Sequence, residues 1–256
     1  MIKISPLFSG SKGNCTLIQS DNANILLDLG YGYKQILSAL ARRNLTPFDI
    51  DGIVITHEHG DHISALQYWA RRYNTSVFVP NPIADYVRAY AYCGAVTPIN
   101  GGFAVKDIDI DRYECSHDSR CCYGYRFTSD GQSVASVTDT GKACCELTEF
   151  LAPCTTVQLE SNHDEDMLFN GRYPYFLKRR IASDFGHLSN RQAAEILTEL
   201  VGGNVKNIIL AHLSEQNNTK ELAFNSAVKV LKEKGLVEGR DISVFVADQY
   251  CNGITL

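Results

Sequence analysis

The sequence predicts a mixed α/β protein, a single domain over residues 1–256 in which two β-sheets carry helices on their outer faces. Three observations support this. Short strand-like apolar segments occur in both halves of the chain, amphipathic helical segments are interspersed with them, and no linker separates the halves. The strands and helices do not alternate regularly, as they would in a doubly wound parallel sheet. The length suits one large α/β domain.

The individual elements follow from hydrophobic periodicity and from the turn residues that bound each segment. In the first half, strands are expected at 2–7, 15–19, 24–29, 52–56, 77–80, 103–105, 108–115 and 123–127, with a helix at 33–43. A second helix is expected from Ile63 to Tyr73, because Leu66 and Ala70 lie between them at helical spacing. In the second half, strands are expected at 133–138, 155–160, 207–213 and 243–246, and helices at 144–151, 174–182, 191–201 and 221–234.

Composition limits the class of protein and its setting. The formal net charge of −5 gives no overall attraction to nucleic acid, although it leaves room for a local basic groove. The first residues contain no apolar segment of a signal peptide, and no apolar run reaches the roughly 20 residues that cross a bilayer. The nine cysteines include no Cys-x-x-Cys pair. We therefore expect free thiols, a cytoplasmic setting and no membrane partner.

The segment 56–62 is the strongest functional signal in the sequence. It reads Thr-His-Glu-His-Gly-Asp-His and places three of the seven histidines directly after an apolar strand. Imidazole nitrogens and carboxylate oxygens are ligands of divalent metals. The spacing differs from the His-Glu-x-x-His helix of zincins, because Asp61 replaces the second histidine and Gly60 would interrupt the helix. A different kind of metal site is therefore predicted, with the candidate ligands His57, His59, Asp61 and His62.

Four further residues follow apolar strands in the same way, and they are His117, Asp139, His163 and His212. Each one alone is more often a hydrogen-bonded histidine or a turn aspartate. Side chains at the carboxyl ends of separate strands can converge on one edge of a sheet. Their joint placement therefore predicts that they contribute to the same site.

His187 precedes a helix. Ser189 and Gln192 form a capping box in front of the helix expected at 191–201. A helix N-terminus attracts anions such as phosphate. The residues alone support two readings equally, a phosphate-binding histidine and a histidine packed into a helix-entry loop.

Together these motifs resemble the metallo-β-lactamase superfamily. The resemblance covers nearly the whole chain, with His-x-His-x-Asp-His at 57–62, then a histidine, a Thr-Asp-Thr-Gly turn and a last histidine. It implies a four-layer αββα sandwich with two divalent metal ions at one edge. By this resemblance His57, His59 and His117 would bind one ion, Asp61, His62 and His212 the other, and Asp139 would bridge them. Zn, Mn and Fe all suit such ligands.

Within the superfamily the chain is most similar to the YycJ/WalJ-like group, which is related to RNase Z and the cyclic phosphodiesterases. The similar motifs lie at 8–14, 160–164, 186–190 and 212–218. Members of the group are described as 5′→3′ exonucleases on double-stranded DNA. The resemblance therefore implies a phosphodiesterase whose nucleophile is a metal-activated hydroxide and whose partner is nucleic acid. The sequence departs from the RNase Z pattern at Asp164, where that pattern has glutamate.

The resemblance also implies roles for residues around the metals. Asp61 would orient or deprotonate the nucleophile, His187 would donate a proton or hydrogen bond, and His163 would position the scissile phosphate. Asp164 is a candidate substrate-binding residue that would fix the tautomer of His163, and for His163 a role in supporting the ligands is the alternative. In the loop 9–14 the candidate substrate contacts are Ser11 and Asn14, although a tight turn between strands explains this loop equally well. Two basic runs, at 71–72 and 178–180, are either contacts to a nucleic-acid backbone or solvated helix faces.

Other functions remain open from the sequence. The same metals could serve a small-molecule hydrolase acting on a cyclic phosphodiester, thioester or lactone, or an RNA-processing nuclease. A metal-dependent sensor with little catalysis and an oxygen-reducing di-iron protein are further alternatives. The sequence leaves open the metal, the type of nucleic acid, the polarity of attack and the oligomeric state.

Overall fold

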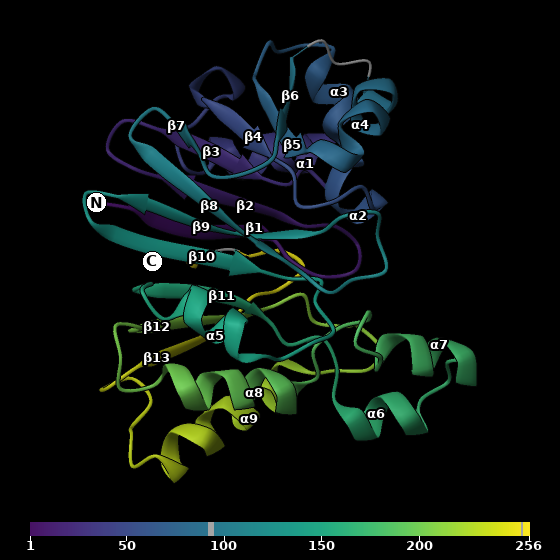
Figure 1. Cartoon of the computed structure of the whole chain (residues 1–256), viewed down its shortest axis with the longest axis vertical. Helices are drawn as coiled ribbons and strands as arrows, with labels where there is room; N and C mark the ends of the chain where they lie inside the picture. Colours follow the sequence, from purple (N-terminus) through teal and green to yellow (C-terminus); the bar gives the residue numbers. More distant parts are fainter. Residues whose placement is uncertain (92–94, 252) are drawn as a thin grey trace.

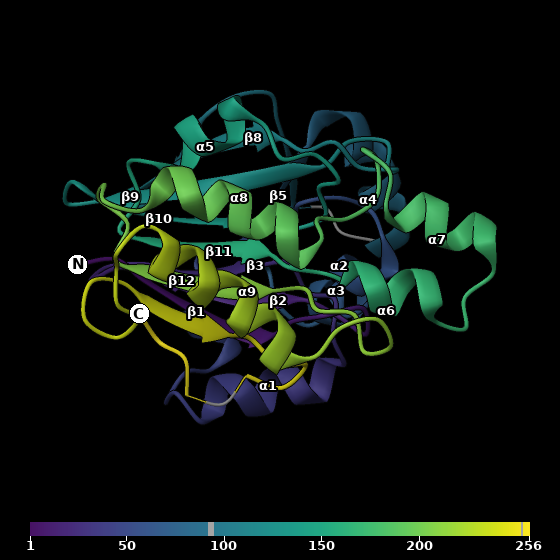
Figure 2. The ribbon, with the colours of Figure 1, turned by 90° about the horizontal axis from the view of Figure 1, so that it is seen from below.

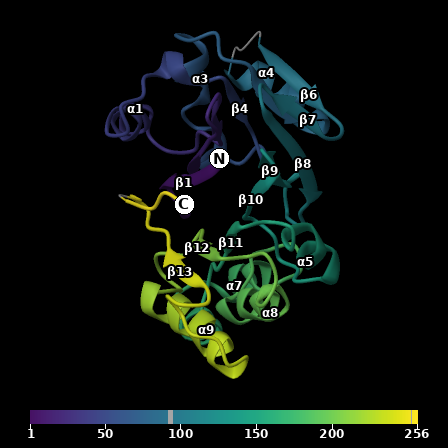
Figure 3. The same cartoon turned by 90° about the vertical axis from the view of Figure 1, so that its left-hand side faces the viewer.

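The computed structural model describes residues 1–91, 95–251 and 253–256. Two β-sheets face each other, and helices cover the outer face of each, which gives four layers in the order αββα (Figures 1 and 3). The predicted fold class is confirmed. No helix within the described ranges has both the length and the apolar character that a membrane span requires.

The first sheet has six strands in chain order. They are β1 (Lys3–Phe8), β2 (Cys15–Gln19), β3 (Asn24–Leu27), β4 (Gly52–Val54), β5 (Val77–Pro80) and β6 (Val96–Ile99). The pairs from β1 to β3 are antiparallel, and those from β3 to β6 are parallel. The helices α1 (Tyr33–Ala41), α3 (Leu66–Ala70) and α4 (Ala84–Ala91) cover its outer face (Figure 1). The short helices η1 (Pro47–Asp49), α2 (Gly60–Ile63) and η2 (Asn81–Ile83) lie in the connections.

The second sheet has seven strands in the order β13-β12-β11-β10-β9-β8-β7. They are β7 (Phe103–Val105), β8 (Ile108–Glu114), β9 (Tyr123–Ser129), β10 (Gln132–Val137), β11 (Thr156–Glu160), β12 (Asn207–Ala211) and β13 (Ser243–Val246). The strands from β10 to β13 are parallel. The helices α5 (Cys145–Leu151), α8 (Asn190–Leu200) and α9 (Lys220–Glu233) cover this sheet, whereas α6 (Glu165–Asn170) and α7 (Tyr175–Ile181) project from the body (Figure 2).

Apolar side chains fill the three spaces between the four layers. Trp69 is buried between the first sheet and its helices, Leu210 between the second sheet and its helices, and Phe127 between the two sheets. Leu256 pairs with the edge strand β1, since it exchanges two backbone hydrogen bonds with Ile4, at 2.8 and 3.1 Å. Burial of these apolar side chains holds the strands in place relative to one another. The loops that follow the carboxyl ends of the strands are therefore held at one edge of the sandwich.

The prediction of one helix from Ile63 to Tyr73 is wrong. The chain there forms α2 and α3, separated by a break at Ser64 and Ala65. The backbone N–H of Ala65 donates to the carbonyl of Leu29 at 2.9 Å, and the carbonyl of Asp61 accepts from the N–H of Asn14 at 2.8 Å. These tertiary bonds replace the hydrogen bond that a continuous helix would form between residues 65 and 61.

Candidate metal centre

Loops that follow four strands bring the candidate ligands together at one edge of the sandwich. The segment 57–62 follows β4 in the first sheet, and the other three ligands follow β8, β10 and β12 in the second sheet. Ligand atoms within each of two groups lie within 4.8 Å of one another: His57 with His59 and His117, and Asp61 with His62 and His212. Asp139 forms a further such group with His57 and His62, so all seven candidate ligands lie at one site.

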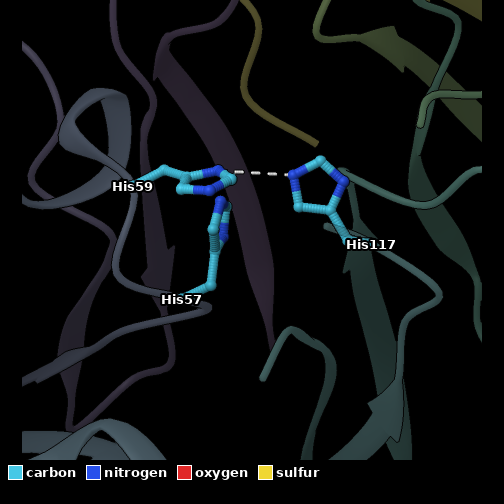
Figure 4. Close-up of side chains that lie close together, drawn as sticks. All are labelled: His57, His59 and His117. Carbon is cyan, nitrogen blue, oxygen red and sulfur yellow. Dashed lines mark hydrogen bonds between the residues drawn. The ribbon is translucent and has the colours of Figure 1, made fainter. Parts of the chain in front are cut away.

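The first group consists of three imidazoles that point toward one another (Figure 4). Nδ1 of His59 lies 3.4 Å from Nε2 of His117, and Nδ1 of His117 donates to the carbonyl of Gly186 at 3.1 Å. Nδ1 of His57 lies 2.9 Å from the hydroxyl of Thr56. The protein therefore holds the outward nitrogen of His57 and of His117, which leaves the other nitrogen facing the centre of the group.

The second group lies beside the first, with Asp139 between them. Nε2 of His62 is 3.2 Å from Oδ2 of Asp139 and 3.5 Å from Oδ2 of Asp61, and Nε2 of His212 is 3.6 Å from the same Asp61 oxygen. The other oxygen of Asp139 lies 3.8 Å from Nε2 of His117 in the first group. This position suits a carboxylate that is shared by two ions.

Three buried polar atoms of candidate ligands make no hydrogen bond to the described residues: Nε2 of His57, Nε2 of His212, and Oδ2 of Asp139, which lies near Nε2 of His62 without a hydrogen bond to it. A buried polar atom that lacks a partner costs free energy. All three belong to candidate ligands and lie where the two groups converge. The residues present therefore fit a pair of bound divalent cations, which would satisfy these atoms.

Two buried carboxylates hold the outer nitrogens of these ligands, and sequence reasoning assigned neither of them a role. Asp28 accepts from Nδ1 of His62 at 2.8 Å, and Glu160 accepts from Nδ1 of His212 at 2.8 Å. Glu160 also accepts from Nδ1 of His187 at 2.8 Å through the same oxygen. Such carboxylates orient metal-binding imidazoles and raise their basicity. The available signal was their position, since each carboxylate stands at or just beyond the end of an apolar strand.

The charges at the site are strongly coupled. Burial alone would raise the pKa of Glu160, but the charge of His187 and hydrogen bonds from two imidazoles lower it to about 2. Burial alone would lower the pKa of His187, and the charge and hydrogen bond of Glu160 raise it instead. The pair therefore consists of a carboxylate and an imidazole whose protonated form is favoured.

Three site residues have backbone conformations that are unusual for residues other than glycine. The φ angles of Asp28, Asp139 and His212 are 61°, 58° and 57°. Left-handed conformations of this kind cost free energy and gather at functional sites. Each one lies just beyond the end of a strand, where it turns the side chain back toward the site.

The metallo-β-lactamase superfamily model matches residues 9–212, a range that contains all seven candidate ligands. The chain belongs to this superfamily. Two relatives are the exodeoxyribonuclease WalJ of Streptococcus pneumoniae, 36% identical over 95% of this chain and 93% of WalJ, and the exodeoxyribonuclease YycJ of Bacillus anthracis, 34% identical over 96% of each chain. A solved structure, the metallo-β-lactamase-fold protein YhfI from Bacillus subtilis, superposes with a TM-score of 0.75 at 17% identity, over 100% of this chain and 98% of that one.

As a superfamily member with this set of side chains, the chain is a metal-dependent hydrolase. The structure also places the residues predicted around the metals. His187 lies beside the second group, with Nδ1 at 3.6 Å from Oδ1 of Asp139. The capping box of Ser189 and Gln192 at the start of α8 is present as predicted. His187 therefore stands between a helix start and the candidate metal ligands.

His163 and Asp164 do not form the pair that the sequence suggested. The carboxylate of Asp164 accepts from the backbone N–H of Met167 at 2.9 Å and caps α6. Nδ1 of His163 is buried without a partner in the described part of the chain. Burial lowers the pKa of His163 to about 4, so its imidazole is neutral near pH 7. Asp164 acts as a helix cap here, since its carboxylate is directed to the first turn of α6.

The two candidates in the loop 9–14 differ in their surroundings. Nδ2 of Asn14 lies 3.0 Å from Nε2 of His62 and 3.4 Å from the carbonyl of Asp61, and Oδ1 of Asn14 accepts from the N–H of Gly10 at 3.0 Å. Ser11 is exposed to solvent. Asn14 therefore contacts the candidate metal-binding segment 57–62, and both Ser11 and Asn14 stay predicted substrate contacts.

Proposed function

We propose that the protein is a dinuclear-metal-dependent phosphodiesterase, and that it acts as a 5′→3′ exonuclease on double-stranded DNA. The names of two relatives that match almost the whole chain support a nuclease. One observation in the structure supports a proton donor beside the proposed ligands. A single oxygen of Glu160 accepts from both His212, a proposed metal ligand, and His187. Asp139, Glu160, His187 and His212 also lie close enough to hold a cation, but Glu160 already accepts from both imidazoles.

The proposed ligands are His57, His59 and His117 for one ion and Asp61, His62 and His212 for the other, with Asp139 between them. Bound divalent ions would supply Lewis acidity and a water of lowered pKa near neutral pH. The carboxylate of Asp61, which is part of the second group, orients the attacking water. Zn, Mn and Fe all fit the ligand types.

The remaining steps belong to side chains of the chain. His187 is held by Glu160 in a form that favours protonation, so it can donate a proton to the leaving oxygen of the phosphodiester. Glu160 keeps its charge and stabilises the imidazolium before the transfer. His163, which is neutral, supplies a hydrogen-bonding imidazole that positions the scissile phosphate. In this proposal His187 protonates the leaving oxygen, and His163 positions the scissile phosphate.

The test is degradation of linear duplex DNA that carries a 5′ phosphate, by protein loaded separately with Mn²⁺ and Zn²⁺. We expect shortening from the 5′ end that depends on metal. His187→Ala should retain its metals and lose about 10²-fold or more in turnover, the scale of a general acid. Asp139→Ala should lose both metal and activity. Intact duplex DNA together with rapid hydrolysis of a simple phosphodiester would contradict the exonuclease and favour a small substrate.

A further inference from the structure

Residues 164–186, which connect β11 to α8, form a segment that we call the α6–α7 arm. Its two helices extend beyond the body of the molecule in two perpendicular views, on the side where α2 lies (Figures 1 and 2). The arm begins directly after His163 and ends directly before His187. Both histidines of the proposed chemistry therefore stand at its base.

The arm carries aromatic side chains that the fold does not bury. None of the seven residues of α7 is buried, although the helix contains Tyr175 and Phe176. These two side chains are 72% and 74% exposed, and Phe185 and Phe169 are 62% and 46% exposed. Rings with this much exposed area are typical of a surface that a partner covers.

The basic residues of the arm lie in its second part, residues 172–186, whereas three acids, Asp164, Glu165 and Asp166, lie at its start. Between residues 172 and 186 there are four basic residues and one acid. Lys178 donates to the carbonyls of Phe169 and Gly171, at 2.7 and 2.8 Å, and so ties α7 to the end of α6. The guanidinium groups of Arg172 and Arg179 are exposed and make no hydrogen bond or ion pair within the described ranges.

The base of the arm is connected to the candidate metal centre by hydrogen bonds. The carbonyl of Gly186 accepts from His117 at 3.1 Å, and the N–H of His187 donates to the carbonyl of Ile181 at 2.9 Å. Phe185 and His117 also line one cavity of about 580 Å³, together with the cation Arg120. A nucleic-acid strand bound along the arm would therefore extend directly to the candidate metal ligands.

We propose that the α6–α7 arm binds unpaired bases of a nucleic-acid strand whose backbone reaches the candidate metal centre. Exposed aromatic rings stack on bases of any sequence, and arginines beside them contact phosphates. The combination of exposed rings, the two arginines Arg172 and Arg179 that are unpaired in the described structure, and continuity with the candidate ligands favours nucleic acid over an apolar protein surface. The proposal rests on the proposed function and adds that the enzyme holds its substrate by a separated strand.

The experiment compares binding of fluorescent oligonucleotides with phosphorothioate linkages, either single-stranded or as a blunt duplex, to the metal-loaded protein. Tyr175→Ala/Phe176→Ala should bind the single strand roughly fivefold to a hundredfold more weakly, as expected from the loss of a stacked base. The blunt duplex should lose less. Arg172→Ala/Arg179→Ala should reduce the slope of log affinity against log salt by about 0.7 for each lost phosphate contact. The matched control is Phe48→Ala, an 84% exposed ring on η1 at the other end of β4, which should bind like the wild type.

Single-strand binding of wild-type strength in the Tyr175→Ala/Phe176→Ala variant would refute the arm as a binding surface, whatever the cleavage assay shows. Absence of binding by the wild type would refute it as well. Binding that depends on the arm, without cleavage of unmodified duplex DNA, would support the arm and contradict the proposed exonuclease. If oligonucleotide binding is unchanged but the double variant abolishes a dimer or adsorption to anionic vesicles, a second copy or a membrane covers the arm instead.

Discussion

Glu160→Gln tests how the site couples metal binding to proton transfer. Four donors surround the carboxylate: Nδ1 of His187 and of His212, both at 2.8 Å, and the backbone N–H groups of Thr140 and Leu188, at 2.9 and 3.2 Å. A glutamine offers one accepting oxygen, so either the two imidazoles or the two amides must face its NH₂ group. The substitution keeps the size of the side chain and removes the charge that both histidines require.

The expected loss has two parts. Metal affinity should fall about 10- to 100-fold, or about 1.4–2.8 kcal/mol, as for other carboxylates that orient metal ligands. Turnover at saturating metal should remain about 10²-fold below wild type, because His187 loses the partner that favours its protonated form. Titration with Zn²⁺ or Mn²⁺, followed by activity on a simple phosphodiester at saturation, measures the two parts separately.

Asp28→Asn is the matched control. Asp28 is buried and holds His62 at 2.8 Å, but neither of its carboxylate oxygens contacts His187 in the described structure. This variant should lose a similar amount of metal affinity and recover most of its turnover once metal is saturating. If Glu160→Gln recovers as fully as Asp28→Asn does, Glu160 has no part in proton transfer and the reasoning fails.

Three further predictions concern stability. Gly30→Ala places a Cβ 1.6 Å from the carbonyl oxygen of Asp61, so we expect about 3 kcal/mol of destabilisation and weaker metal binding. Gly60→Ala is the control: its Cβ meets open space, so the free energy of unfolding and the metal affinity should both stay nearly unchanged. The pKa of His163 is about 4 in the folded protein and about 6.5 in the unfolded chain. Between pH 6.5 and pH 4 only the unfolded chain is protonated at this residue, so His163 alone should lower the free energy of unfolding by about 1.4 kcal/mol for each pH unit of acidification. Other shifted groups also contribute to the pH dependence, so the measurement is a difference between two metal-free proteins. In urea unfolding, the free energy of unfolding of wild type should fall with decreasing pH about 1.4 kcal/mol per pH unit more steeply than that of His163→Asn. Equal slopes would contradict the prediction. For protein held at a free metal concentration about 100-fold above Kd, chelation should lower the wild-type free energy of unfolding by about 2.7 kcal/mol for each of the two ions. A thermal midpoint that shifts equally in Asp139→Ala would exclude the proposed ligand set.

Features that depend on short-range patterns were predictable from the sequence. The alternation of 108–115 predicted β8, and the capping box of Ser189 and Gln192 predicted the start of α8. The strand β6 was not predicted, because Pro98 lies within it, and such a strand is tolerated at the sheet edge that it occupies. The helix α4 was also missed, although its buried Ala84, Val87 and Ala91 carry a helical spacing.

The candidate site divides in the same way. The convergence of the candidate ligands could be predicted, because each one stands at the end of a strand that its own neighbours identify. The roles of Asp28 and Glu160 could not be predicted, because their partners are distant in the sequence. His62 lies 34 residues from Asp28, and His212 lies 52 residues from Glu160. Only the packing of the two sheets brings such pairs together. The single-domain boundary and the individual roles of the site residues stay predictions.

The distribution of the ligands over both sheets has a consequence for biosynthesis. The segment 57–62 belongs to the first sheet, but each proposed ion also needs a ligand from the second sheet, and His212 follows β12 late in the chain. Chains fold from the N-terminus while they are made. With the proposed ligand set, the three imidazoles of the segment 57–62 lack a partner from the second sheet until residue 117 has been made, and the second ion lacks His212 until β12 has been made. An ion captured before then would be held by an incomplete set of ligands, so we expect the second ion to load correctly only after β12 has formed.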